Sequence, residues 1–313
     1  MNRRRFTKKA MKVGLAAAGA YVLGRGAYCA FWESYHLRVT KWSVPLPRLP
    51  ADLDGLRIGF LSDTHLCPSM PNEYVARTLD LVGQLAPEAI MFTGDLLSEP
   101  ADRLPQYLDL FAGVEAPRGK YAVLGNHDFF YERSGPATAF LRETEWRPLR
   151  NQNIALPETK GRVWIAGVDD PFSGREDLDA ALTGVPEDAV CILLSHTPDL
   201  IEPVTAAGVD LMLAGHTHGG QIVLPFIGPP VVPSKYGAKY AWGLFDCRGT
   251  RMAVTRGVGM ISPRIRFNCR PEVVLLTLRR GDGELPAGGP ERDLRPQVRR
   301  MRSGMHRLRK LTR

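Results

Sequence analysis

Short apolar runs alternate with stretches of helical spacing from Leu56 onward, and this alternation predicts an α/β fold. The runs expected to form strands span residues 56–61, 89–92, 121–124, 163–166, 190–194, 211–214, 252–255 and 273–278. Apolar residues at helical spacing predict one helix over 75–85 and another over 104–111. Glycine and proline mark the joins between these elements, and the chain shows no internal repeat.

Metal-binding residue types stand immediately after five of these predicted strands. They form five motifs along the chain: Asp63-Thr64-His65, Gly94-Asp95, Gly125-Asn126-His127-Asp128, Ser195-His196 and Gly215-His216-Thr217-His218. Five of the seven histidines belong to the motifs. Because ligands of α/β sheets bind where the carboxyl ends of strands converge, we expect these residues to meet at one point. Carboxylate, imidazole and amide groups together predict a site for divalent metals.

Taken one at a time, the same residues have simpler explanations. Asp63, Asp95 and Asp128 could each cap a following helix. His196 could be a buried imidazole of the core, and Asn126 could be a turn residue. All of these coincidences would have to occur together and in order, so the set favours a metal site.

In these five motifs the chain resembles the calcineurin-like metallophosphoesterase superfamily, from about Leu56 to Leu278. The resemblance implies an α/β fold, a four-layer α-β-β-α sandwich of two mixed sheets, and a metal-dependent hydrolase of phosphoric esters or anhydrides. It implies two metal ions, the first held by Asp63, His65 and His218, the second by Asn126, His196 and His216, with Asp95 bridging both. Manganese, iron and zinc all suit such oxygen and nitrogen ligands, so the identity of the metals stays open.

The resemblance also implies catalytic roles for two further residues. A metal-bound hydroxide would be the nucleophile. His127, next to Asn126, would be the acid that protonates the leaving group. Asp128 would orient His127 or anchor the turn.

A longer set of motifs resembles the bacterial membrane-associated branch of this superfamily. These are Gly215 to Gln221, Leu224-Pro225-Phe226, Lys235-Tyr236, Arg256 to Gly259 and Arg270-Pro271-Glu272. That branch includes phosphoesterases exported by the twin-arginine route and UDP-2,3-diacylglucosamine hydrolases of lipid A synthesis. The loop 219–240 follows two predicted ligands directly, so we expect it to line the substrate pocket, with Lys235 and Tyr236 contacting substrate.

The net charge of +8 is unevenly distributed. Residues 1–12 contribute +6 and residues 291–313 contribute +7, so 8 − 6 − 7 leaves −5 for residues 13–290. A body that binds nucleic acid would carry its own basic face, so no nucleic-acid partner is expected and a nuclease is disfavoured. Basic ends suit an anionic membrane surface; a solvated tail is the alternative. The oligomeric state stays open.

The N-terminus is expected to lie outside the fold. Residues 2–8 resemble a twin-arginine export signature, and the weakly apolar stretch 13–24 is shorter than the roughly 20 residues of a spanning helix. We therefore expect a signal or membrane anchor over 1–34, a catalytic domain over 35–280, and a Gly/Pro linker with a basic tail over 281–313. The alternatives to export are an anchored body on the cytoplasmic face and a cytoplasmic protein with a basic start.

The leading functional hypothesis is hydrolysis of a phosphodiester or pyrophosphate bond in a membrane-linked substrate such as UDP-2,3-diacylglucosamine. A lipid A precursor fits a body facing the cytoplasm, whereas an exported body fits a cell-envelope phosphodiester. The alternative to an enzyme is a catalytically inactive scaffold of the same fold. It is disfavoured because all seven predicted ligands and His127 are present.

Overall fold

The computed structural model describes residues 14, 19–20, 24–98, 101–130 and 133–285, and every structural statement below concerns these residues. Most of the predicted signal segment and nearly all of the basic tail lie outside them. Among the described residues, we find no helix with the length and apolar character needed to cross a bilayer.

The first of two six-stranded sheets has the order β1-β12-β2-β3-β4-β5. Its strands are β1 (Arg38–Leu46), β12 (Glu272–Arg280), β2 (Arg57–Leu61), β3 (Ala89–Phe92), β4 (Lys120–Ala122) and β5 (Trp146–Pro148). Strands β2 to β5 are parallel, β12 is antiparallel to β2, and β1 is parallel to β12.

The second sheet has the order β10-β11-β9-β8-β7-β6. Its strands are β10 (Gly243–Cys247), β11 (Thr250–Val254), β9 (Leu211–Ala214), β8 (Val190–Leu194), β7 (Val163–Gly167) and β6 (Gln152–Ala155). The four inner strands are parallel, and both edge strands run antiparallel to their neighbours.

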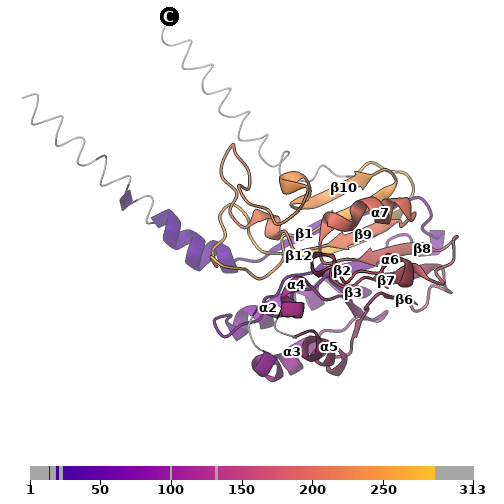
Figure 1. Ribbon diagram of the computed structural model, residues 1–313, viewed down its shortest axis with the longest axis horizontal. Helices are drawn as coiled ribbons and strands as arrows, with labels where there is room; N and C mark the ends of the chain where they lie inside the picture. The colour runs from indigo at the N-terminus through magenta and orange to yellow at the C-terminus, as the bar shows by residue number, and fades with distance from the viewer. Residues whose placement is uncertain (1–13, 15–18, 21–23, 99–100, 131–132, 286–313) are drawn as a thin grey trace, which may run out of the picture.

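Helices cover the outer faces of the two sheets (Figure 1). The first sheet packs against α2 (Asn72–Gln84), α3 (Leu108–Ala112) and α5 (Ser134–Glu143), the second against α6 (Leu178–Leu182) and α7 (Ile201–Ala206). One further α-helix, α4 (Asn126–Phe129), lies after β4. Short 3-10 or π segments are η1 (Tyr28–Trp32), η2 (Glu33–Tyr35), η3 (Ala51–Leu53), η4 (Ala101–Tyr107), η6 (Pro171–Ser173), η7 (Pro198–Leu200), η8 (His218–Gly220) and η9 (Gly237–Tyr240).

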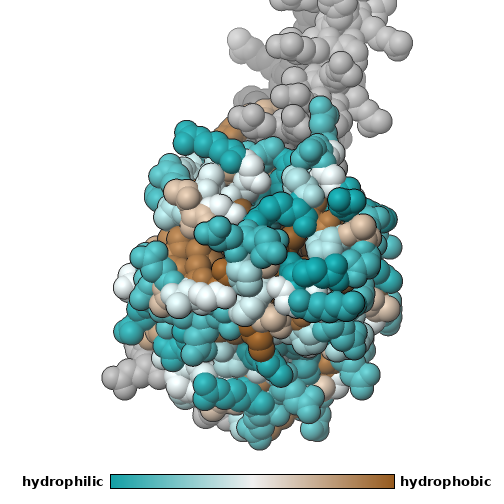
Figure 2. All heavy atoms as spheres, turned by 90° about the vertical axis from the view of Figure 1, so that its right-hand side faces the viewer, coloured by the Kyte–Doolittle hydropathy of each residue, from teal (hydrophilic) through white to brown (hydrophobic). Residues whose placement is uncertain are grey.

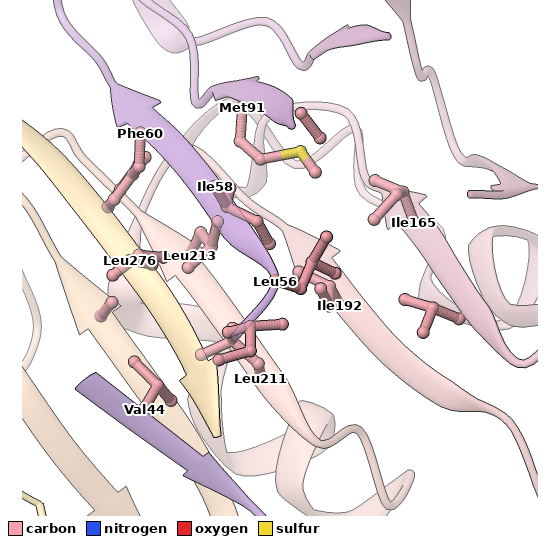
Figure 3. Close-up of a cluster of buried hydrophobic side chains, with 14 of the residues drawn as sticks. Val44, Leu56, Ile58, Phe60, Met91, Ile165, Ile192, Leu211, Leu213 and Leu276 are labelled. Carbon is pink, nitrogen blue, oxygen red and sulfur yellow. The ribbon is translucent and has the colours of Figure 1, made fainter. Parts of the chain in front are cut away.

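Side-chain alternation along the strands builds the layers. On β2, Ile58 and Phe60 point between the sheets while Leu61 points toward α2. On β8, Ile192 enters the inter-sheet core and Leu193 packs under α7. Figure 3 shows the inter-sheet cluster, with residues of β2 and β3 facing residues of β7, β8 and β9. The predicted four-layer α-β-β-α sandwich of two mixed sheets is therefore confirmed.

The eight predicted strands are the eight inner strands of the two sheets, and the four that the sequence did not predict are the four edges. Edge strands contain exposed and partly buried positions, as in the first six residues of β1 and throughout β6, so they lack a continuous buried apolar run. The predicted helix over 104–111 is instead a 3-10 segment that contains Pro105, followed by the short α3, because proline disrupts α-helical hydrogen bonding.

Polar side chains cover most of the exterior. Figure 2 shows one face on which hydrophilic residues predominate and apolar residues lie mainly in recesses between them. On such a polar surface, the few exposed apolar side chains mark candidate sites of interaction.

Candidate metal centre

The five predicted motifs meet at the carboxyl ends of the strands. Asp63, Asp95 and Asn126 follow β2, β3 and β4 of the first sheet, and His196 and His216 follow β8 and β9 of the second. The parallel strands point their carboxyl ends to the same side, so loops from both sheets converge there.

One group of ligand atoms is formed by Asp63, His65 and His218. The Nε2 atoms of His65 and His218 lie 3.0 Å apart. Asp63 Oδ1 lies 3.5 Å from His218 Nε2 and 3.9 Å from His65 Nε2. All three side chains are buried, so these nitrogens and oxygens face one another away from water.

A second group is formed by Asp95, His196 and His216. His196 Nε2 lies 3.2 Å from Asp95 Oδ2 and 3.1 Å from His216 Nδ1. These side chains are buried as well. Two imidazole nitrogens that face each other at this distance next to a carboxylate form a suitable pocket for a cation.

Asp95 joins the two groups through a single atom. Its Oδ2 lies 3.4 Å from His65 Nε2 and 3.2 Å from His196 Nε2. Its other oxygen, Oδ1, accepts a hydrogen bond of 2.8 Å from the His127 backbone N–H. The carboxylate is thus held in the position that a bridging ligand requires.

Five of these residues have backbone conformations that are uncommon for side chains with a Cβ. Positive φ angles occur at Asp63 (57°), His65 (47°), Asp95 (56°), His216 (69°) and His218 (51°). Such conformations cost free energy and cluster at functional sites, where the surrounding structure enforces them. The sequence pattern gave no sign of this strain.

Two motif glycines allow the close approach of the loops. A Cβ at Gly215 would overlap the Ser62 hydroxyl and the Asp63 carboxylate. A Cβ at Gly125 would overlap Asp95 and the ring of His196. Glycine is therefore needed at both positions because the loops of the two sheets are in direct contact there.

Residues outside the motifs orient two of the imidazoles. His196 Nδ1 donates to the Thr93 carbonyl at 2.7 Å, which directs Nε2 toward Asp95. His65 Nδ1 lies 2.7 Å from the Ser98 hydroxyl. Such outer contacts are typical of histidines that bind metals. Sequence reasoning did not find Thr93 or Ser98, although both flank the Gly94-Asp95 motif.

Burial and mutual charge govern protonation in the metal-free centre. Burial raises the pKa of Asp63 to about 6 and lowers the pKa of His65 and of His216 to about 3. Burial also opposes the charged form of His196, but Asp95 outweighs it and raises the pKa of His196 to about 10. Burial disfavours the Asp95 anion too, yet His196 holds the pKa of Asp95 well below its usual range. The centre therefore contains one close ion pair surrounded by neutral imidazoles.

An unpartnered buried oxygen supports the presence of a cation. Asn126 Oδ1 is a buried polar atom without a hydrogen-bond partner among the described residues. Asn126 directly follows Gly125, which packs against Asp95 and His196. Buried polar atoms are seldom left unsatisfied, so this oxygen fits a ligand of an ion. The donor set suits two divalent ions, although the role of each residue as a ligand stays a prediction.

The structure separates the expected roles of His127 and Asp128. The His127 ring is partly exposed and meets the His65 ring edge-on, with centroids 4.8 Å apart. A His127 ring nitrogen also lies within 4.8 Å of ligand atoms of His65 and Asp95. Burial lowers the pKa of His127, which favours the neutral ring. Its predicted role as the acid is not tested by this geometry.

Asp128 serves the backbone. Its carboxylate accepts hydrogen bonds from the N–H groups of Leu96 (3.1 Å), Leu97 (3.0 Å) and Gly125 (3.0 Å). These bonds tie the loop after β3 to the loop after β4. Of the two roles expected for Asp128, the geometry supports anchoring the turn.

Lys235 and Tyr236 contact each other beside the core on the outer face of the second sheet. The Lys235 ammonium lies over the Tyr236 ring, 5.0 Å from its centroid. Tyr236 packs against Tyr240 in the core on the outer face of the second sheet. In the described part of the chain, neither side chain has a hydrogen bond or ring contact with the Asp and His cluster. Their contact with substrate stays a prediction.

Two exposed aromatic rings lie beside the centre. Phe172, which is 61% exposed, has its ring centroid 5.3 Å from that of His216. Phe130, which is 40% exposed, lies 5.2 Å from the ring of His127. Phe130 stands three residues after His127 in the sequence, whereas Phe172 follows no motif and was not predicted.

Comparison with known proteins agrees with this geometry. The calcineurin-like phosphoesterase family model matches residues 56–220. The chain is 32% identical to uncharacterized metallophosphoesterase YkuE of Bacillus subtilis, covering 89% of this chain and 98% of the relative. It is 28% identical to UDP-2,3-diacylglucosamine pyrophosphatase LpxG of Chlamydia trachomatis, covering 85% and 98%. A transmembrane protein with metallophosphoesterase domain from Danio rerio is 28% identical, covering 77% of this chain and 57% of that protein.

Among solved structures, a dimetal phosphatase from Danio rerio is similar with a TM-score of 0.46 at 13% identity, covering 72% of this chain and 99% of that one. The family model and the YkuE relative both extend over at least half of the chain. The residues matched by the family model include all five motifs, and four of these motifs supply the residues of the two ligand groups. The chain belongs to the calcineurin-like phosphoesterase family.

Proposed function

We propose that this chain uses two divalent ions to hydrolyse a phosphodiester or pyrophosphate bond, in a substrate carried by a lipid. The observation that carries the proposal is the position of Asp95 Oδ2, which lies within 3.4 Å of a ligand nitrogen of each group. A single carboxylate oxygen between two ligand groups suits a pair of ions that act on one phosphoryl group.

Each protein group has a defined task in this proposal. Bound ions would supply Lewis acidity and activate a water molecule. Asp63, His65 and His218 would hold the first ion, Asn126, His196 and His216 would hold the second, and Asp95 would be shared by both. His127 protonates the leaving oxygen, which its partial exposure and position beside His65 permit. Asp128 keeps the two loops in register.

Two features support a lipid-linked substrate. One similar protein is named a UDP-2,3-diacylglucosamine pyrophosphatase, so a nucleotide-linked lipid with a pyrophosphate bond is our first candidate. The exposed rings of Phe130 and Phe172 border the centre and could contact an acyl chain or sugar ring. A cell-envelope phosphodiester is the second candidate, favoured if residues 1–34 direct export. With either substrate, Lys235 and Tyr236 would contact a part of the molecule that is remote from the reacting phosphorus atom.

The proposed site of action is the membrane. Residues 1–34 would act as a twin-arginine signal or anchor, 35–280 as the catalytic domain and 281–313 as a basic tail. Fusing residues 1–40 to an export reporter tests this arrangement. Export that requires Arg3 and Arg4 supports an outer location, whereas equal export after Arg3→Lys and Arg4→Lys contradicts the twin-arginine route and favours the cytoplasmic face.

The hydrolytic activity is tested with the purified full chain after loading with manganese, iron or zinc. Bis-p-nitrophenyl phosphate, p-nitrophenyl phosphate and UDP-2,3-diacylglucosamine should be compared, with metal content measured in parallel. We expect diester or pyrophosphate cleavage that depends on about two bound ions per chain. A metal-loaded protein inert toward all three substrates would contradict the proposal and revive the inactive scaffold.

A further inference from the structure

An exposed apolar turn projects from the loop between the last metal-type motif and η9. Leu224 and Gly228 exchange two backbone hydrogen bonds, of 3.0 and 2.9 Å, which close the turn. Phe226 and Ile227 at its tip are 55% and 74% exposed, and Val231 is 73% exposed. These three residues, here named the apolar tip, are three of the seven exposed large hydrophobic side chains in the described part of the chain.

The apolar tip has a fixed position relative to the metal centre. Val223 N–H donates to the Phe267 carbonyl at 2.8 Å, and Phe267 N–H donates to the Gln221 carbonyl at 2.9 Å. The Gln221 side chain donates to the Pro263 carbonyl at 2.9 Å. His218 lies only three residues before Gln221, so the same loop carries a predicted metal ligand and the tip.

The N-terminal helical segment packs on the loop 256–271, which also holds the base of the apolar tip. Glu33 accepts a hydrogen bond of 3.0 Å from the Cys269 backbone N–H. The Arg25 guanidinium lies 5.0 Å from the centroid of Phe267. Figure 1 shows the N-terminal helix leaving the body on the side where the orange loop projects. Segments 24–32, 219–240 and 256–271 therefore form one unit, here named the docking face.

The docking face is basic although the body of the protein is acidic. Its charged residues are Arg25, Lys235, Lys239, Arg256, Arg264, Arg266 and Arg270. Its three segments contain no Asp or Glu, and the two acidic residues that directly flank them, Glu33 and Glu272, are buried. All of the basic residues except Arg256 and Arg266 are at least partly exposed. Since residues 13–290 sum to −5, removing these seven positive charges leaves −12 for the remainder. Positive charge is thus concentrated in the segments that carry and support the apolar tip.

We propose that the docking face binds an anionic phospholipid membrane, with the apolar tip inserted into the interfacial region. Tyr28 and Trp32 on the N-terminal segment are 37% and 44% exposed, and such aromatic side chains favour the boundary between headgroups and acyl chains. Basic groups around a small apolar insertion match the negative headgroups of a bilayer. This contact would place the metal centre next to the membrane surface, and it goes beyond the proposed hydrolysis.

A polarity-sensitive fluorophore at the tip tests the proposal. The full chain carrying Ile227→Cys should be labelled with a nitrobenzoxadiazole maleimide and mixed with phosphatidylcholine vesicles, with or without phosphatidylglycerol. We expect a blue shift and quenching by acyl-chain spin labels only when phosphatidylglycerol is present. Among the five native cysteines, four are buried and Cys247 is partly buried, so labelled wild-type protein measures the background.

Glu158→Cys is the matched control. Glu158 has an exposed side chain in the turn before β7, at the strand ends opposite the metal centre. Its fluorophore should show no shift with either vesicle. An unchanged spectrum at position 227, an equal response to vesicles without phosphatidylglycerol, or a shift at high protein concentration without vesicles overturns the proposal. The last result would indicate contact between copies of the chain.

A triple variant, Phe226→Ser, Ile227→Ser and Val231→Ser, separates this inference from the proposed function. Its rate on vesicle-embedded lipid substrate, divided by its rate on soluble bis-p-nitrophenyl phosphate, should fall about tenfold relative to wild type. The ratio cancels any effect of the loop 219–240 on the substrate pocket itself. An unchanged ratio contradicts membrane docking by the tip. Wild-type protein inert toward both substrates contradicts the proposed function and leaves the fluorophore result standing.

Discussion

The inter-sheet core and the metal centre differ in how each is built from the same strands. In the core, Ile58, Phe60 and Leu213 follow the regular alternation of extended strands and are fully buried. A few residues beyond the strand ends, Asp63 and His216 have positive φ angles and bury charged or polar groups. The core gains stability from regular conformation, whereas the centre sacrifices local stability for ligand placement.

Replacing Asp95 should have the largest effect. Asp95→Asn keeps an oxygen that can accept from the His127 N–H but removes the negative charge between the two ligand groups. We expect loss of measurable turnover and of at least one ion per chain, because two cations lose their shared anion. Metal analysis and bis-p-nitrophenyl phosphate hydrolysis measure the effect.

A second buried carboxylate provides the control for Asp95. Asp210 is buried and pairs with Arg48 at 2.5 Å. It contacts β8 at the N-terminal end of β9, the strand end opposite the metal centre. Asp210→Asn should lower thermal stability and leave metal content unchanged. Full metal occupancy in Asp95→Asn would contradict the bridging role.

His127→Ala should have the next largest effect, slowing turnover by about 10² to 10⁴-fold while metal content stays at the wild-type level. The reason is that His127 is expected to deliver a proton and not to hold an ion. Single-turnover rates should be compared for substrates with good and poor leaving groups. The loss should be smaller with p-nitrophenolate, a leaving group that needs little protonation.

The opposite outcomes would identify His127 as a ligand. A ring nitrogen of His127 lies within 4.8 Å of ligand atoms of His65 and Asp95, so metal binding by this residue is geometrically accessible. Metal loss equal to that of Asp95→Asn, or an effect independent of the leaving group, would contradict the acid role.

The eight inner strands and the position of the candidate ligands at their carboxyl ends could be predicted from the sequence for the same physical reason. Buried parallel strands need continuous apolar runs, and polar residues immediately after such runs must lie at the strand ends. The four edge strands were missed because exposure on one side relaxes the need for apolar residues, as in β6 with Gln152 and Asn153. Contacts between segments distant in sequence, such as Phe172 with His216, leave no local pattern.

A core substitution should have a smaller effect of a different kind. Leu213→Ala removes a fully buried side chain between the sheets, two residues before Gly215. We expect the free energy of unfolding to fall by about 2 to 5 kcal/mol through lost burial and a residual cavity. Chemical denaturation measures this change, and turnover of the folded fraction should stay within about twofold of wild type because strand position is held by neighbours on both sides. A large loss of turnover at unchanged stability would show that core packing directly sets the ligand positions.

The smallest expected effect, measured over a single pH unit, is a pH dependence of metal affinity that the core does not share. Asp95 raises the pKa of His196 to about 10 against the effect of burial, so metal-free protein holds a proton on His196 below that pH. A metal ion must displace this proton before His196 can bind it. Burial raises the pKa of Asp63 to about 6, so Asp63 is already ionised above pH 6. Between these values, affinity should rise by about tenfold per pH unit, with one proton released per ion bound at the His196 group.

Calorimetric titration with manganese in two buffers of different ionisation enthalpy measures this proton release. Below pH 6 the slope should steepen, because Asp63 also becomes protonated and a second proton must leave. His196→Asn removes the displaced proton and should flatten the dependence between pH 6 and 10, at the cost of a weaker second site. Wild-type affinity that is constant across this range would mean that the ion pair of Asp95 and His196 does not exist in the metal-free centre. In that case the metal centre would differ from the inter-sheet core only in its strained backbone. The charges of Asp95 and His196 would then neither destabilise the metal-free fold nor make metal binding depend on pH.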